Sequence, residues 1–180
     1  MSLDEPTQAG PPSAYFPNVG DSIVVGIVDV ATYQQKDYDS GAPLTWPDGN
    51  PRIGKVVTGL VVSTNGAVGG GERNNAPVGP GDLVTFWCEG SKWYTYDAAL
   101  REAGGVDRGH VMRWARVADK PPTNPRHNAA KQYEAKIRPP KAEDGDLVAR
   151  CIAAFNERQR TQLDVAPVGA SAPIQDDDPF

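Results

Sequence analysis

Aromatic and basic side chains occur close together throughout the body of the chain, and this pattern carries the most chemical information. The two kinds recur together near residues 33–38, 46–55, 87–94 and 113–116. Aromatic rings stack on nucleobases at roughly 1–3 kcal/mol per base, whichever base is present, while Lys and Arg neutralise phosphates. The pattern favours contact with single-stranded nucleic acid, with stacking by Trp46, Trp87, Trp93, Trp114 and Tyr33 and phosphate binding by Arg52, Lys55, Lys92, Arg113 and Arg116.

Most of these rings have a second interpretation, because an aromatic residue on a strand often belongs to the core. Trp46 is the clearest exception, since it lies among the loop-forming residues PLTWPDGNPR and is expected to be exposed. For Trp87 and Trp114 only the strand register determines the direction of the side chain, because a shift of one residue moves it to the other face of the sheet. Both alternatives stay open for these two residues.

No arrangement typical of an enzyme is found. His110 and His127 are the only histidines, and no nucleophile, base and orienting group form a recognisable set with them. Asp37, Asp39 and Asp48 follow no cation-ligand pattern and are interpreted as turn-forming residues. We therefore expect no catalysis, no cofactor and no bound metal.

Cysteine usage and hydropathy bear on the compartment. Cys88 and Cys151 lie far apart and have no partners at metal-ligand spacing, so neither a disulfide framework nor a zinc site is expected. No apolar run approaches the length of a membrane span, and the first residues lack the apolar segment of a signal peptide. These features predict a cytoplasmic protein with no membrane partner.

The formal charge of -5 is distributed unevenly along the chain. Residues 1–140 hold 14 basic and 15 acidic side chains, whereas residues 141–180 hold 4 and 8. The acidity belongs mostly to the C-terminal part. A nearly neutral body is compatible with a nucleic-acid interface and also with a protein-interaction module that binds no DNA.

The residues above must be positioned mainly by strands, because 19 Gly and 17 Pro among 180 residues favour short strands and loops. Runs of β-branched residues and turn signals predict three strands, one helix and two further strands, over residues 23–33, 53–64, 83–89, 96–103, 109–118 and 131–138. Residues 65–80 are predicted to form a loop. This β-β-β-α-β-β order is that of the five-stranded OB-fold barrel, an all-β fold that binds oligonucleotides on strands 2–3 and on its loops.

Three segments flank this predicted domain of residues 19–140. Residues 1–18 contain four Pro and are predicted to form a flexible N-terminal arm, and residues 164–180 a disordered linker with an acidic tip. Residues 141–163 contain a predicted helix, over 145–162, with an apolar stripe that either packs on the barrel or mediates self-association. The stripe consists of Leu147, Val148, Cys151, Ile152 and Phe155.

The chain ends in an acidic run closed by an aromatic residue: Asp176, Asp177, Asp178, Pro179 and Phe180. A solvating tail gains nothing from a large apolar last residue, whereas capture of a C-terminal carboxylate is a known recognition mode. The ending DDDPF closely resembles the terminal tip of bacterial single-stranded DNA-binding proteins. The segment YDAALREA after the third predicted strand is also similar to the corresponding segment of that family.

The resemblance implies a non-catalytic protein whose OB-fold coats and protects single-stranded DNA and whose tip recruits replication, recombination and repair enzymes. The chain departs from the family pattern at three places: the loop around Trp46, the glycines at 69–71 and the helix predicted within 143–162. These departures look more like a bacteriophage-encoded protein of this kind, which would act in the host cytoplasm. We expect a homo-oligomer. The alternative is an OB-like protein-interaction or phage assembly module without DNA binding, and RNA in place of DNA stays open as the ligand.

Overall fold

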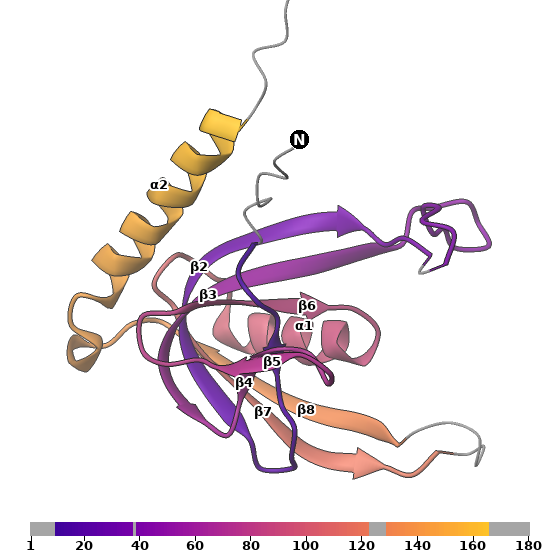
Figure 1. The fold of residues 1–180 in the computed structure, drawn as a ribbon, viewed down its shortest axis with the longest axis horizontal. Helices are drawn as coiled ribbons and strands as arrows, with labels where there is room; N and C mark the ends of the chain where they lie inside the picture. The colour runs from indigo at the N-terminus through magenta and orange to yellow at the C-terminus, as the bar shows by residue number, and fades with distance from the viewer. Residues whose placement is uncertain (1–9, 38, 123–128, 166–180) are drawn as a thin grey trace, which may run out of the picture.

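The computed structural model describes residues 10–37, 39–122 and 129–165, and its main element is a curved five-stranded antiparallel sheet (Figure 1). Its strands lie in the order β6-β3-β2-β7-β8. The sequence predicts all five to within two residues at each end. Their bounds are β2 (Ser22–Gln34), β3 (Ile53–Asn65), β6 (Leu83–Cys88), β7 (Val111–Lys120) and β8 (Ala130–Arg138).

Two long hairpins, β2–β3 and β7–β8, extend towards the same side of the molecule, and helix α1 (Ser91–Ala103) lies between them (Figure 1). The helix begins five residues earlier than the predicted 96–103. It ends where predicted, because Gly104 adopts the left-handed conformation with φ of 72° that commonly terminates a helix. The first turn of α1 therefore carries residues 91–94, which precede the predicted helix.

The concave side of the sheet holds the main core. Strand alternation brings branched and aromatic side chains from β2, β3, β6, β7 and β8 to this side, where α1 and the N-terminal segment close over them. Phe86, Trp114 and Tyr133 form a chain of ring contacts at centroid distances of 5.7 and 6.2 Å. Phe16 joins them, with its ring 5.8 Å from that of Tyr133.

A second, smaller sheet was not predicted. Its strands are β1 (Ala14–Tyr15), β4 (Val68–Gly70) and β5 (Asn75–Pro77), in the order β1-β4-β5. The prediction of a flexible arm over residues 1–18 is therefore wrong over residues 12–16, because Pro12 accepts a hydrogen bond from Thr85 N, β1 is hydrogen-bonded and Phe16 is buried. The predicted loop over 65–80 is likewise wrong in part, since β4 and β5 lie within it.

A closed barrel is not confirmed. The terminal strands of the five-stranded sheet, β6 and β8, are not hydrogen-bonded to each other. Helix α1 packs against both of these strands, and the N-terminal segment contacts β6 through the bridge between Ser13 and Thr85. We call this region between β6 and β8 the seam.

Helix α2 (Leu147–Val165) packs on the outer face of the sheet, which favours the first of the two roles predicted for its apolar stripe. Leu147 and Cys151 are buried against Val28, Leu60 and Val111, whereas Ile152 is 44% exposed. The close approach needs a glycine on β2, because a Cβ at Gly26 would lie 2.7 Å from the Cys151 sulfur. Two irregularities in the β2–β3 register flank Gly26, a position typical of a glycine inside a strand.

A short connection joins β8 to α2. Arg138 donates hydrogen bonds to both carboxylate oxygens of Asp144, at 2.6 and 3.1 Å, and this pairing holds the pKa of Asp144 at about 2. Asp144 lies in the 3-10 turn η1 (Ala142–Asp144), where it also accepts from the Lys141 amide. Within the part of the chain that the structure covers, neither helix is long and apolar enough to cross a membrane.

Candidate nucleic-acid interface

A groove of about 450 Å³ lies between the β2–β3 connection and the first turn of α1. It brings together three predicted site residues, Trp46, Arg52 and Trp93, from two segments distant in sequence. We call it the Trp46–Trp93 groove. Its lining is completed by Gln35, Pro51, Ile53, Gly90 and Tyr94.

The hairpin connection holds Trp46 through backbone hydrogen bonds. Gln35 N donates to the Arg52 carbonyl at 2.8 Å, and Trp46 N donates to the Asn50 carbonyl at 2.7 Å. Asp48 accepts from Asn50 N at 3.0 Å, which confirms its predicted role as a turn residue. Trp46 is therefore displayed on an ordered turn, with 52% of its surface exposed.

Arg52 lies over the exposed indole of Trp46, with the guanidinium carbon 4.6 Å from the ring centroid. This cation–π contact holds the guanidinium near the ring face. Arg52 forms no ion pair among the described residues, and its buried Nε has no hydrogen-bond partner there. A stacking surface and an unneutralised cation are thus placed side by side in the groove.

Lys55 adds a second cation next to the groove. Its Nζ is 5.0 Å from the Trp93 ring centroid and 5.5 Å from that of Tyr96. In the β3–β6 register Lys55 is paired with Cys88, which is fully buried, so the two side chains share the inner face of the sheet. Four predicted residues, Trp46, Arg52, Lys55 and Trp93, therefore belong to one site.

Tyr33 and Trp87 form a separate aromatic pair near the same end of the sheet. Trp87 is adjacent to Cys88 on β6 and so points to the opposite face from Lys55. The two rings are 5.0 Å apart at 77°, and Trp87 is 46% exposed. The Tyr33 hydroxyl donates to Glu89, and burial together with this bond raises the pKa of Tyr33. This pair can stack on a base, but Glu89 opposes a phosphate beside it.

Lys92 and Arg113 lie outside the groove. Lys92 is in the first turn of α1, half-buried at the seam, with its Nζ 5.2 Å from the Tyr133 ring centroid. Arg113 is exposed on β7, paired with Val24 of β2 and Lys136 of β8. Val24 and Gln34 are ten residues apart on β2, roughly 30 Å of strand. Arg113 therefore cannot act on a nucleotide in the groove.

The predicted contacts of Trp114 and Arg116 with DNA need correction. Trp114 is 1% exposed, because β7 turns it towards the concave core, where it packs on Phe86 and Tyr133. Arg116 is 8% exposed and pairs with Asp119 at 2.7 Å. It also donates to the backbone carbonyls of Phe16 and Pro17. Both residues stabilise the fold, and neither belongs to the candidate interface.

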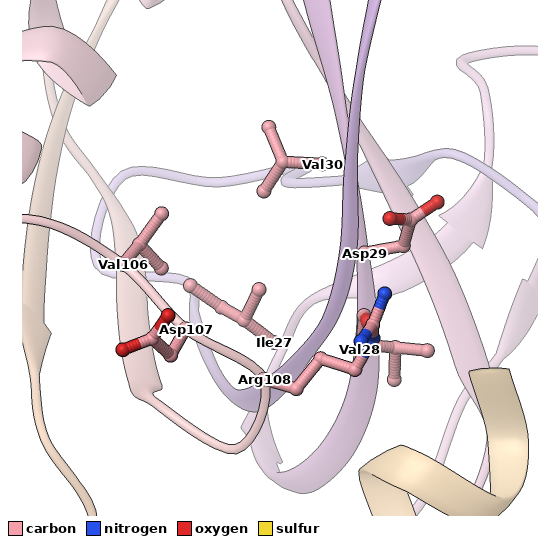
Figure 2. A pocket seen from close by; sticks show the side chains of 7 residues that line it. All are labelled: Ile27, Val28, Asp29, Val30, Val106, Asp107 and Arg108. Carbon is pink, nitrogen blue, oxygen red and sulfur yellow. The ribbon is translucent and has the colours of Figure 1, made fainter.

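A second pocket, of about 240 Å³, lies where β2 meets the α1–β7 connection (Figure 2). Its two carboxylates, Asp29 and Asp107, do not point towards each other (Figure 2). Arg108 donates to the Val28 carbonyl at 3.0 Å and lies 3.4 Å from the Phe155 ring centroid, so it links this region to α2. No group of three or more potential metal ligands occurs in the described residues.

Several groove residues were not predicted. Tyr94 is 70% exposed and follows Trp93 in the first turn of α1. Its sequence signal was present in the run Lys92–Trp93–Tyr94, but only the earlier start of the helix places it at the groove. Gln35 and Ile53 carry no such signal, because their position depends on how the hairpin connection folds back.

The acidic tip lies outside the described residues, together with the rest of the linker after residue 165 and with His127. The proposed partner-binding role of Asp176–Phe180 therefore stays a prediction. Comparison of the chain with family models, with curated proteins and with solved structures finds no match. Functional inference therefore rests on the residues themselves.

Proposed function

We propose that this protein binds single-stranded DNA without catalysing a reaction. The observation that carries the proposal is the Trp46–Trp93 groove, in which Arg52 lies over the exposed ring of Trp46 while Lys55, next to the groove, lies against the half-buried ring of Trp93. Neither cation has a carboxylate partner among the described residues. Stacking tolerates every base, and the cations attract the backbone phosphates. Binding should therefore be tolerant of sequence and should weaken steeply with salt.

The strand order supports an OB-like architecture. β2 pairs with β3 and with β7, β3 pairs with β6, and β7 pairs with β8, which are the neighbours expected of a five-stranded OB-fold opened between its third and fifth strands. In this interpretation the groove lies at the loop between the first two strands of the fold. That loop is one of the two through which OB-folds bind oligonucleotides.

Titration with oligo-dT tests the proposal. Stacking on the exposed indoles of Trp46 and Trp87 should quench tryptophan fluorescence, whereas the buried Trp114 should contribute little to the change. Trp46→Ala removes a stacking surface and Arg52→Ala a cation, so each should weaken binding by about 1–3 kcal/mol, or roughly 5- to 150-fold.

Arg101→Ala is the matched control. Arg101 is an exposed cation in the last turn of α1, already paired with Asp97, so its loss should leave oligo-dT affinity nearly unchanged. Equal affinity for duplex DNA at matched salt would contradict the proposal. Unquenched fluorescence would instead favour a protein-interaction module without DNA binding.

The acidic tip complements this proposal. We propose that Asp176–Phe180 recruits a partner enzyme with a basic rim and an apolar slot, as the resemblance to bacterial single-stranded DNA-binding proteins implies. Support comes from the residue types alone: three carboxylates, a terminal carboxylate and one aromatic anchor. The protein would then bring that enzyme to the strand it coats.

A further inference from the structure

Three lysines at the inner side of the sheet lie against aromatic rings. Lys55 contacts Trp93 and Tyr96, Lys92 contacts Tyr133, and Lys131 contacts Tyr15, at Nζ-to-centroid distances of 4.7–5.5 Å. None of the three forms an ion pair in the ranges that the structure covers, where the paired cations are Arg101, Arg116, Lys136 and Arg138. The cations of this region are oriented by rings and are not neutralised.

Lys92 and Lys131 reach the seam from its two sides, Lys92 from α1 and Lys131 from β8. Lys131 lies two residues before Tyr133 on β8, so both side chains share the inner face of this strand. Lys92 reaches the Tyr133 ring from the first turn of α1, and Lys131 Nζ is 3.5 Å from the Tyr15 hydroxyl. Burial lowers the pKa of Lys92, and the charge of Lys131 lowers it further.

Ammonium groups that repel each other in a partly buried region are stabilised when an anion lies near both. A cavity of about 170 Å³ is lined by Lys92 and by Tyr15, whose hydroxyl is 3.5 Å from Lys131 Nζ, while Lys131 itself lies outside the lining. The ammonium group is a compact donor suited to phosphate oxygens. Charge, geometry and space therefore point to the same class of ligand.

We propose that Lys92 and Lys131 form a phosphate-binding site at the seam, positioned by Tyr15 and Tyr133, which receives a backbone phosphate of a nucleic-acid strand lying in the Trp46–Trp93 groove. The inference rests on the proposed function. Lys92 directly precedes Trp93 on α1, and its Nζ is 5.2 Å from the Tyr133 ring centroid on β8, so a strand that leaves Trp93 towards β8 would run past Lys92. The path thus crosses the seam between the edge strands and leaves the outer face of the sheet, where Arg113 lies, uncovered.

The salt dependence of oligo-dT binding tests the site. Each phosphate neutralised on a single strand contributes about -0.7 to the slope of log K against log salt concentration. The double variant Lys92→Gln, Lys131→Gln should make the slope shallower by about 0.7 and lower affinity about 5-fold at 0.1 M salt. Lys92→Arg with Lys131→Arg should restore most of the slope, because charge is retained.

The matched control is Arg101→Gln with Lys136→Gln. It removes the same charge from the same two elements, but at positions that are exposed and paired with Asp97 and Glu134. The slope of log K against log salt concentration for this control should equal that of the unchanged protein. The single variant Lys131→Gln keeps the site testable if the double variant does not fold. An unchanged slope in Lys131→Gln and in the double variant overturns the phosphate site while leaving the proposed function intact. Failure of the unchanged protein to bind oligo-dT would overturn both.

Discussion

At the scale of residues, the candidate interface depends on cations held by rings rather than by carboxylates. A surface ion pair would neutralise a cation before a phosphate arrived, whereas a cation–π contact orients it and leaves its charge in place. Arg52 over Trp46 and Lys55 beside Trp93 show this arrangement. Arg116 shows the opposite one, since its charge is satisfied by Asp119 and it serves only to fasten the N-terminal segment.

Trp114 is buried and Trp46 is exposed, so we expect their replacement to affect stability differently. Trp114→Ala should lower the free energy of unfolding by about 3–5 kcal/mol, because it removes a fully buried ring from the core. Trp46→Ala should change it by less than about 0.5 kcal/mol, because Trp46 lies on an exposed turn. Urea denaturation of the two variants measures both values. Equal stability of the two variants would show that Trp114 is not a core residue.

At the scale of elements, α2 is held to the sheet by close packing at Gly26 and by contacts of Arg108, Phe155 and Arg158. The absence of a side chain at Gly26 leaves room for Leu147 and Cys151 of α2. Arg108 lies against the ring of Phe155 on α2, and Arg158 of α2 donates a 2.6 Å hydrogen bond to the Thr58 hydroxyl on β3. The helix packs on the outer face of the sheet through Leu147 and Cys151, so this part of its apolar stripe is used within the chain, while Ile152 stays exposed. Any self-association must therefore use another surface or displace this contact.

Gly26→Ala tests this packing. The added Cβ would lie 2.7 Å from both the Cys151 sulfur and a Leu147 methyl group, so we expect a loss of about 1–3 kcal/mol in stability and faster proteolysis within α2. Gly71→Ala is the control, because a Cβ there meets nothing within 4 Å. If Gly26→Ala is as stable as Gly71→Ala, α2 does not pack on β2 as the structure shows. Limited proteolysis and thermal unfolding supply the two measurements.

At the scale of the whole molecule, the proposed DNA-binding groove and helix α2 lie at different places along the main sheet. The Trp46–Trp93 groove includes Gln35, the first residue after β2, whereas α2 packs on β2 at Gly26 (Figure 1). These two residues are nine positions apart, roughly 30 Å along an extended chain. The chain continues from α2 to its acidic end. A strand in the groove therefore does not cover the helix from which the tail continues.

Deletion of Asp176–Phe180 should leave oligo-dT affinity equal or higher, because the tip brings only negative charge, which competes with phosphates for Lys and Arg. The same deletion should abolish recruitment of partner enzymes to coated DNA. Fluorescence titration and co-sedimentation with immobilised oligo-dT measure the two effects. Neutral replacement of the three Asp with Asn, keeping Pro179 and Phe180, separates charge from the aromatic anchor. Weaker DNA binding after the deletion would contradict this role of the tip.

Much of the fold could be predicted because its signals are local. A strand needs alternation and β-branched residues over a few positions, so the five strands of the main sheet and helix α2 follow from short stretches of sequence. Trp46 was correctly expected to be exposed for the same reason, since its neighbours form a turn whatever the rest of the chain does. The acidic tip is likewise a local pattern and stays a prediction.

The directions of side chains could not be predicted in this way. Trp87 and Trp114 look alike in sequence, yet one is 46% and the other 1% exposed, because each lies on a strand whose buried face depends on partners distant in the chain. The same holds for the pairing of Lys131 with Tyr15, and for the cover that α2 provides at Gly26. Secondary structure depends mostly on neighbours along the chain, whereas a binding surface depends on which faces the packed elements leave uncovered.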